Sequence, residues 1–212
     1  MAHLMNPSTT SRPQNVSRET FSPLPDFVAL LLKWNSTINL IGPATENDVW
    51  ARHIDDSSQL VALIPSNVTS LVDLGSGAGL PGLVIAILRP ELQVTLVEQD
   101  QRKAAFLKEA KRVLGLVNVT VAAMDIAKLD QKFDMVTARA LAPLRVLLGM
   151  AKPLMEAGAV CIFPKGANYA NELCEAAAKW RFEHSLKPSA TNAQASLITI
   201  TKLTQLLNVN QG

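Results

Sequence analysis

Cysteine, histidine and aromatic residues are scarce in this chain, and each scarcity narrows its chemistry. The 212 residues include 2 cysteines and 3 histidines. Cys161 and Cys174 are too few for a disulfide framework, and no spacing typical of a metal site occurs. We therefore expect a reduced, cytoplasmic protein without a bound metal. Aromatic residues make up 5% of the chain, so no stacking platform for single-stranded RNA can be identified.

Long apolar runs and a strong charge of one sign are also missing. The apolar stretch at residues 80–88 is too short to cross a membrane, and we expect no membrane partner. The formal net charge of +2 permits a nucleic-acid partner but does not require one. With 48% hydrophobic residues, a chain of 212 residues is long enough for one domain with a sizeable core. We expect it to act as a monomer.

The spacing of apolar residues divides the chain into three parts. Residues 1–22 are rich in Ser, Thr, Asn and Pro, and we expect a mobile arm there. Residues 23–66 predict helices packed on the core, the second at 46–63 with Thr45 as its N-cap. Strands and helices then alternate through 67–212, which predicts an α/β fold with a doubly wound, Rossmann-like, mostly parallel sheet of seven strands. Strands are expected at 70–74, 94–98, 118–122, 134–138, 159–163, 180–186 and 197–202, and helices at 81–88, 101–115, 143–155 and 168–179.

A buried strand, a glycine loop and a helix start follow one another at residues 71–82. Glycine lets the backbone bend tightly and lets a ligand lie directly against it. Open α/β sheets bind nucleotide-like ligands at such a turn. The next strand ends in Glu98, where a carboxylate can accept both ribose hydroxyls, although an ordinary surface acid is the alternative. The residues expected around the ligand here are Asp73, Gly75, Gly77, Gly79 and Leu80.

Two ligand classes compete for this loop. Gly77, Gly79 and Gly82 spell G-x-G-x-x-G, which leaves a nicotinamide-dependent oxidoreductase open, but this frame starts past the end of the strand. From Asp73 onward, the acidic residue followed by three spaced glycines resembles motif I of methyltransferases that use S-adenosyl-L-methionine. We therefore expect that cofactor. A methyltransferase-like protein that binds RNA without activity is a third reading.

The segments after the fourth and fifth strands bear on the methyl acceptor. The Asn/Asp-Pro-Pro-aromatic motif that accompanies methylation of exocyclic amines is absent from residues 134–144. Cys161 lies in the middle of an apolar strand, where a buried structural thiol is expected instead of a nucleophile. An acceptor that is already nucleophilic remains. Guanine N7 fits, because its lone pair carries no proton and its methylation depends on alignment.

Several blocks together resemble a known family, the bacterial GidB/RsmG methyltransferases, which modify guanine N7 in 16S ribosomal RNA. The Arg-His-Ile-Asp-Asp-Ser block at 52–57 and the Arg-Ala-Leu-Ala-Pro-Leu block at 139–144 make the resemblance specific. It implies a class I methyltransferase sheet with an N-terminal helical extension. It also implies 16S ribosomal RNA or the small ribosomal subunit as partner. Further matching blocks are residues 34–41, the glycine loop through 82, and 163–166.

The resemblance also assigns residues to the cofactor. It implies that Gly75 and Leu80 line the pocket, that Glu98 holds the ribose, and that the loop at Asp125 and Ile126 flanks the adenine. This chain departs from the family in two places. Met124-Asp125-Ile126-Ala127 replaces the usual Ala-Glu of the adenine loop, and Ala195-Ser196 stands where the family tends to have an Arg before the last strand.

Four further side chains are candidates for the reaction and for RNA. Arg139, at the end of a buried strand, is expected to pair with the methionine carboxylate, with an ion pair to Glu98 or Asp73 as the alternative. Arg52 is expected on an RNA phosphate. His53 is expected near the target base or the cofactor, or else hydrogen-bonded to Asp55 or Asp56. Lys165 is expected on RNA phosphate or guanine O6, or else in solvent.

Overall fold

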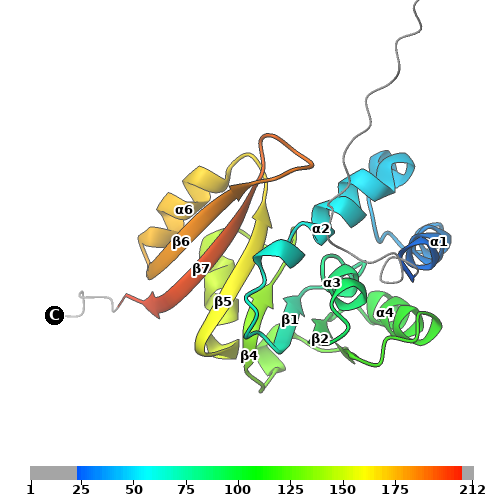
Figure 1. The fold of residues 1–212 in the computed structure, drawn as a ribbon, viewed down its shortest axis with the longest axis horizontal. Helices are drawn as coiled ribbons and strands as arrows, with labels where there is room; N and C mark the ends of the chain where they lie inside the picture. Colours follow the sequence, from blue (N-terminus) through cyan, green and yellow to red (C-terminus); the bar gives the residue numbers. More distant parts are fainter. Residues whose placement is uncertain (1–22, 207–212) are drawn as a thin grey trace, which may run out of the picture.

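Seven strands form one sheet in the order β3-β2-β1-β4-β5-β7-β6 in the computed structural model, which describes residues 23–206 (Figure 1). The arm expected at residues 1–22 lies outside the described residues. Neighbouring strands from β3 to β5 run parallel, whereas β7 is antiparallel to both β5 and β6. The expectation of an α/β fold with a mostly parallel sheet is therefore confirmed. The strands are β1 Ser70–Leu74, β2 Gln93–Val97, β3 Val119–Ala122, β4 Phe133–Thr137, β5 Met155–Lys165, β6 Trp180–Pro188 and β7 Ser196–Gln205.

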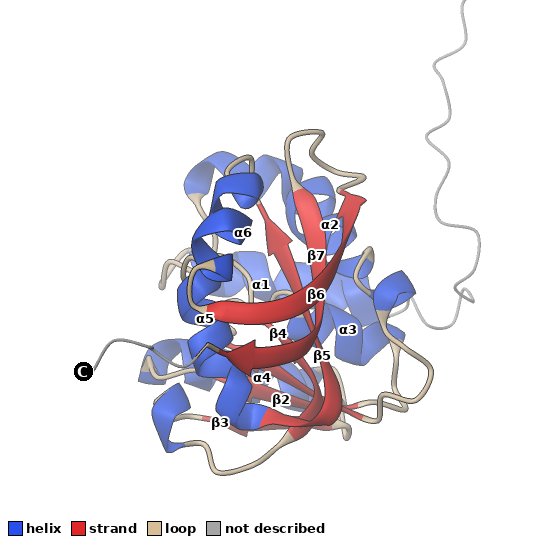
Figure 2. Cartoon of the chain, turned by 90° about the vertical axis from the view of Figure 1, so that its left-hand side faces the viewer, coloured by secondary structure: helices blue, strands red, loops and turns tan. Residues whose placement is uncertain are grey.

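Helices cover both faces of this sheet, with α3 on one side and α5 and α6 on the other (Figure 2). Side chains alternate between the faces along each strand. In β1, Leu71 joins the core beneath α3 and α4, while Val72 joins the core beneath α5. None of the described helices is long and apolar enough to span a membrane. The helices are α1 Pro23–Asn35, α2 Asp56–Ser58, α3 Gly82–Leu88, α4 Gln101–Val113, α5 Leu144–Ala151 and α6 Tyr169–Ala177.

The N-terminal helical segment packs on the same core as the sheet. Phe27 of α1 is completely buried and belongs to one apolar cluster with Leu71 of β1 and Phe106 of α4. The rings of Trp34 and Phe106 lie 5.7 Å apart between centroids. The packing of the partly buried Trp34 on the buried Phe106 holds α1 against α4.

The single helix expected over residues 46–63 is wrong. The chain instead forms a 3₁₀-helix at Pro43–Asp48, a π-helix at Trp50–Asp55, the short α2, and a 3₁₀-turn at Val61–Leu63. Thr45 does not cap a helix, because its hydroxyl donates to the Gly42 carbonyl at 2.8 Å and also contacts His53. The wide π-helical turn brings the 52–53 segment against Arg139, a long-range contact that apolar spacing cannot reveal.

Candidate active site

The carboxyl ends of the parallel strands meet at one edge of the sheet, and the predicted site residues follow those ends. Leu74 of β1 lies beside Val97 of β2, which in turn lies beside Ala122 of β3. On the other side, Asp73 of β1 is in register with Thr137 of β4. The segments after these four strands therefore come together.

The loop after β1 is built on glycines that adopt left-handed backbone angles. Gly75, Gly77 and Gly79 have φ of 62°, 55° and 77°. A Cβ atom on Gly77 would meet a single neighbouring atom, the Gly75 carbonyl oxygen at 3.8 Å. The space above Gly77 is thus open for close approach of a ligand to the backbone.

Glu98 is tied to this glycine loop. The side chain is buried, with the residue 7% exposed. One carboxylate oxygen accepts the Gly77 N–H at 2.9 Å and the other accepts the Asp100 N–H at 2.8 Å. This burial rules out an ordinary surface acid. Each oxygen keeps a lone pair for a further donor, such as a ribose hydroxyl.

Asp73 lies beneath the loop and is completely buried. Its Oδ2 accepts the Gly82 N–H at 3.1 Å, whereas its Oδ1 has no hydrogen-bond partner within the described residues. Burial raises the pKa of the Asp73 carboxyl to about 7. A buried polar atom without a partner is uncommon in native proteins and is typical of a site that awaits a ligand or water.

The loop after β3 carries the residues expected at the adenine. Asp125 accepts the Ala127 N–H at 2.9 Å and so caps the 3₁₀-turn Ile126–Lys128. Ile126 is half-buried, and the neighbouring Met124 is exposed. Asp125 therefore orders this loop, and its role toward an adenine amine stays a prediction.

Arg139 follows β4 and joins the N-terminal segment to this edge. Its Nη1 lies 3.3 Å from Asp56 Oδ2 and donates to the Arg52 carbonyl at 3.4 Å. Its Nη2 lies 3.2 Å from His53 Nδ1. The ion-pair partner is thus Asp56, and neither Glu98 nor Asp73.

His53 is held between Arg139 and Thr45, whose Oγ1 lies 2.8 Å from His53 Nε2. Both ring nitrogens of His53 are therefore engaged, Nδ1 by Arg139 and Nε2 by Thr45. Burial, together with the Arg139 charge, lowers the pKa of His53 to about 4. The imidazole is therefore neutral at physiological pH. Arg52, whose carbonyl contacts Arg139, keeps an exposed side chain.

A pocket of about 670 Å³ opens beside this network. Its walls come from the 40–56 segment, the loop after β4, the end of β5 and the β6–β7 loop. Arg52, His53, Arg139 and Lys165 all line it. Where the resemblance led us to look for an Arg, the small residues Ala195 and Ser196 form the wall.

Lys165 reaches this pocket from the end of β5 but is already engaged. Its Nζ donates to the Ala142 carbonyl at 2.8 Å and pairs with Glu172 of α6 at 2.6 Å. Elsewhere in β5, Cys161 is completely buried, and burial raises the pKa of its thiol to about 12. The prediction that this cysteine is a structural thiol is therefore confirmed.

The structure thus brings the candidate residues into two adjoining groups. The glycine loop and Glu98 form the first group, and the pocket with Arg52, His53 and Lys165 forms the second. Arg139 and the loop after it lie between them. The sequence reading did not assign the residues that hold these groups in place. Asp56 lies inside the 52–57 block and could have been found there. Glu172, which pairs with Lys165, and Thr191, whose hydroxyl donates to Asp56 Oδ1 at 2.8 Å, carry no local signal.

S-adenosylmethionine fits the first group by three observations. Gly77 leaves room above the backbone, Glu98 offers a buried carboxylate to a ribose, and Asp73 has an orphaned oxygen beneath the loop. The strand order and this glycine site are those of a class I methyltransferase that uses S-adenosyl-L-methionine, in agreement with the family match that follows.

The chain belongs to the GidB family, described as rRNA small subunit methyltransferase G, which matches residues 21–204. It is 47% identical over 191 residues to the ribosomal RNA small subunit methyltransferase G of Cereibacter sphaeroides, covering 88% of this chain and 91% of that protein. It is 46% identical over 187 residues to the protein of the same name from Gluconobacter oxydans, covering 88% and 95%.

Solved structures show the same fold at low sequence identity. TYW2 of M. jannaschii, crystallised in complex with AdoMet, superposes with a TM-score of 0.54 at 14% identity, covering 73% of this chain and 76% of that one. The ribosomal protein L11 methylase of Lactobacillus delbrueckii subsp. bulgaricus gives 0.54 at 14% identity, covering 70% and 76%. These structures confirm the expected fold, and the family match confirms the expected class of enzyme.

Proposed function

We propose that this protein transfers the methyl group of S-adenosyl-L-methionine to N7 of a guanine in 16S ribosomal RNA. The observation that carries the proposal is the junction at Arg139, where the glycine-loop group meets the 670 Å³ pocket at one edge of the sheet. The names of the relatives, ribosomal RNA small subunit methyltransferase G, support the choice of RNA. Membership of the GidB family favours a methyltransferase over a nicotinamide-dependent oxidoreductase.

The donor side is formed by residues that recognise an adenosyl group. Gly75, Gly77 and Leu80 would lie along the cofactor, and Glu98 would accept its ribose hydroxyls. Asp125 and Ile126 would flank the adenine. Arg139 has five N–H donors, of which three are directed at Asp56, Arg52 and His53, and it can offer the others to the methionine carboxylate.

The chemistry needs alignment more than proton transfer. When bound, the cofactor supplies an electrophilic methyl group on a sulfonium. The guanine N7 lone pair forms the new C–N bond while the C–S bond breaks and its electron pair stays on sulfur. N7 carries no proton, so no base has to remove one. A neutral His53 that orients Arg139 suits such a reaction, in which proximity and orientation lower the barrier.

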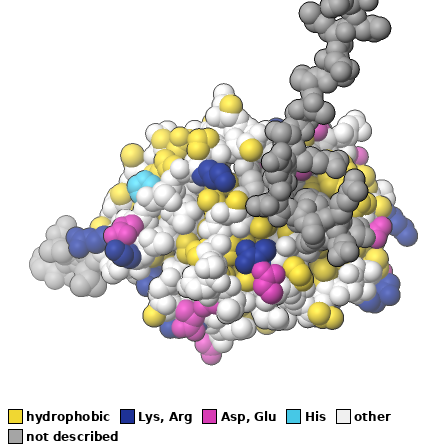
Figure 3. Space-filling model, viewed as in Figure 1, with side chains coloured by type: hydrophobic (Ala, Val, Ile, Leu, Met, Phe, Trp, Pro, Cys, Tyr) yellow, Lys and Arg dark blue, Asp and Glu magenta, His cyan; other side chains and the backbone are white. Residues whose placement is uncertain are grey.

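The acceptor side fits a nucleotide presented by folded RNA. Basic side chains on the face seen in Figure 3 are separated by acidic and apolar groups and do not form one stripe. RNA recognition would then rest on the pocket, with Arg52 on a phosphate, and on the shape of the RNA. We propose that the protein acts as a cytoplasmic monomer on 16S ribosomal RNA or on the small ribosomal subunit.

One experiment tests the reaction and its alternatives together. The protein is incubated with methyl-labelled S-adenosylmethionine and 16S RNA, as naked transcript and as small subunit, and the RNA is digested to nucleosides. We expect the label in 7-methylguanosine. Label in N6-methyladenosine would contradict the assignment. Binding of S-adenosylmethionine without transfer to either substrate would favour the inactive RNA-binding alternative, and thermal stabilisation by NAD alone would favour the oxidoreductase.

A further inference from the structure

The loop at residues 140–143 separates the two groups of the site. It begins after Arg139 and ends where α5 starts at Leu144. Ala140 has a φ of 54°, which is unusual for a residue with a side chain and has to be held by its surroundings. The Leu141 side chain lies directly over the glycine loop, because a Cβ on Gly75 would come within 2.7 Å of it. The 140–143 loop therefore forms a wall of the donor site as well as of the pocket.

The side chains of Lys165 and Glu172 hold this loop through its backbone atoms. Lys165 Nζ donates to the Ala142 carbonyl at 2.8 Å. Glu172 Oε2 accepts the Leu144 N–H at 2.6 Å and pairs with Lys165 Nζ at 2.6 Å. The Lys165 and Glu172 side chains are 10% and 18% exposed. One carboxylate oxygen thus binds both the lysine that holds the loop and the first N–H of α5.

This arrangement conflicts with a phosphate role for Lys165. Reaching an RNA phosphate would take the ammonium group away from Glu172 and leave a largely buried carboxylate without its counter-charge, which is costly. It would also release the Ala142 carbonyl. Lys165 is only 10% exposed and already has two partners, so it is not free to bind a phosphate.

We propose that Lys165 and Glu172 are positioning residues that press the 140–143 loop onto the glycine loop, so that they set the affinity for the methyl donor. Lys165 does not contact RNA phosphate. This inference rests on the proposed function, because it concerns the same site. It assigns the pair to the donor side of the reaction, although the lysine lines the acceptor pocket.

The test is a double-mutant cycle read out by calorimetric binding of S-adenosylmethionine. We expect Lys165→Met and Glu172→Met each to raise the dissociation constant about tenfold. The double variant, which carries no unpaired charge, should raise it by much less than the product of the two single effects. Glu172→Gln keeps an acceptor for the Leu144 N–H, so it should raise the dissociation constant less than Glu172→Met does. It replaces the methionine variants in the test if these do not fold. Additive losses, or unchanged donor affinity in all variants, would overturn the proposal.

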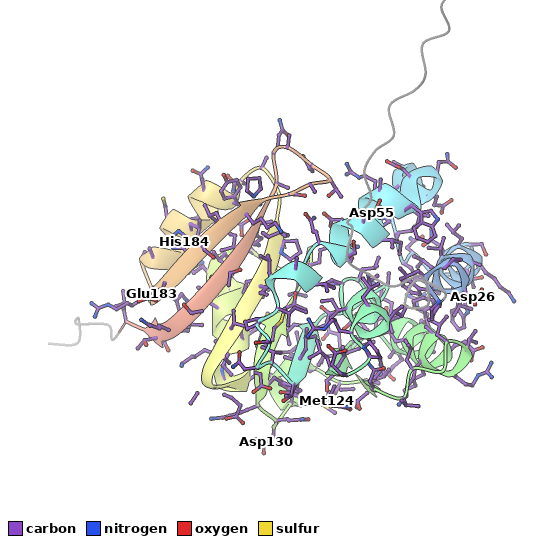
Figure 4. All side chains as sticks on the ribbon, viewed as in Figure 1. Asp26, Asp55, Met124, Asp130, Glu183 and His184 are labelled. Carbon is purple, nitrogen blue, oxygen red and sulfur yellow. The ribbon has the colours of Figure 1, made fainter. Side chains whose placement is uncertain are left out.

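An exposed lysine–glutamate pair offers a matched control. Lys202 Nζ of β7 lies 2.8 Å from Glu183 Oε1 of β6, with side chains 73% and 63% exposed. Glu183 lies on the outer strand, well away from the β6–β7 loop that borders the pocket (Figure 4). Lys202→Met and Glu183→Gln should leave donor binding unchanged. A loss as large as that of Lys165→Met would contradict a specific role for the buried pair.

RNA binding gives the second readout. A lysine on a phosphate contributes about one unit to the slope of log K against log salt, so its loss flattens that slope. We expect Lys165→Met to leave the slope for 16S RNA unchanged, and a slope reduced by about one would overturn the proposal. Failure of the wild-type protein to bind S-adenosylmethionine would contradict the proposed function itself. If the wild-type protein binds S-adenosylmethionine and the Lys165 and Glu172 variants bind it equally well, only this inference is contradicted.

Discussion

The hydrogen bonds around Arg139 have a fixed direction, because a guanidinium can only donate. His53 Nδ1 must accept from Arg139, so the ring proton sits on Nε2 and is donated to Thr45 Oγ1. The Thr45 hydroxyl in turn donates to the Gly42 carbonyl. A protonated His53 would oppose Arg139 with a second positive charge, which agrees with the lowered pKa of the ring. One neutral tautomer therefore holds Arg139 in place.

Removal of the arginine tests its role toward the donor. Arg139→Ala should weaken S-adenosylmethionine binding by about 1–3 kcal/mol, the scale of hydrogen bonds to charged groups. Isothermal titration calorimetry measures this directly. Arg112→Ala is the matched control, because Arg112 pairs with Glu109 at 2.8 Å on the exposed side of α4. Equal donor affinity in wild type and Arg139→Ala would move Arg139 to a structural or RNA-facing role.

The lowered pKa of His53 has a consequence for stability. Between pH 6.5 and about pH 4 the unfolded chain takes up a proton at His53 that the folded chain does not. The free energy of unfolding should therefore fall as the pH drops through this window. His53→Gln removes this contribution, so the advantage of wild type over the variant should shrink toward acid. Urea denaturation at a series of pH values measures the free energy of unfolding of both proteins. If the difference between wild type and His53→Gln stays constant from pH 6.5 to pH 4, the lowered pKa of His53 is contradicted.

Individual site residues were predictable where a strand end placed them. Glu98 and Arg139 follow buried strands, and parallel strands put their carboxyl ends at one edge. Their partners were not predictable in the same way. Asp56 meets Arg139 across 83 residues of sequence, and that approach depends on the packing of the N-terminal segment against the sheet.

Among the elements, the glycine loop has a backbone conformation that leaves room for a ligand. The Gly77 N–H bonds to Glu98, while the position of its missing side chain faces open space. A side chain there would obstruct a ligand without disturbing the core. The conformation and the open space together explain why glycine is required.

Gly77→Ala should abolish donor binding while leaving the fold intact. Gly115, which precedes β3 at the opposite edge of the sheet, has a φ of +64°, and a methyl group added there would meet no heavy atom within 4 Å. Gly115→Ala therefore matches the backbone strain of about 1–2 kcal/mol without touching the site. Thermal melts should shift similarly for both variants, and calorimetry should find binding lost only for Gly77→Ala. Retained affinity in Gly77→Ala would place the donor elsewhere.

The β6–β7 loop is fastened to the N-terminal segment by Gln59 and Asp56. Gln59 accepts the Ala190 N–H at 3.0 Å and donates to Ser189 Oγ at 3.1 Å. Thr191 donates to Asp56 Oδ1 at 2.8 Å. The wall of the pocket on this side is thus held by side-chain contacts between segments far apart in the sequence.

Gln59→Ala should loosen this wall. We expect faster hydrogen exchange in residues 189–195 and a KM for RNA raised several-fold, because the loop borders the acceptor pocket and not the glycine loop. The dissociation constant for S-adenosylmethionine should stay the same. Unchanged hydrogen exchange in residues 189–195 would contradict the predicted loosening. A loss of S-adenosylmethionine affinity as large as the rise in KM would contradict the assignment of this loop to the acceptor pocket alone.

Helices and strands with a clear apolar period were predicted well, whereas the irregular segment at residues 46–63 was not. The strand expected at 94–98 is observed at Gln93–Val97, and the helix expected at 81–88 at Gly82–Leu88. The helix expected at 143–155 ends at Ala151, one residue before a 3₁₀-turn that contains Pro153. The segment at 46–63 carries helical spacing, yet its contacts with Arg139 and with the β6–β7 loop favour a broken path.

At the scale of the whole molecule, the fold places both groups of the proposed site at one edge of the sheet. The parallel strands carry the glycine-loop group, and the N-terminal segment and the β6–β7 hairpin form walls of the pocket beside it. Because residues 23–66 share a core with the sheet, we propose that they form one structural domain with the rest of the described chain. The topology followed from the alternation of strands and helices, whereas the closure depends on contacts too distant in sequence to be read locally.

A crystal structure with S-adenosylmethionine or its demethylated product tests the central claim most directly. The account predicts the ribose hydroxyls on the Glu98 carboxylate, the chain of the cofactor along Gly75 and Gly77, and the sulfur facing the pocket beside Arg139. Electron density for the cofactor at any other place, or a glycine loop that stays empty at saturating concentration, would contradict it.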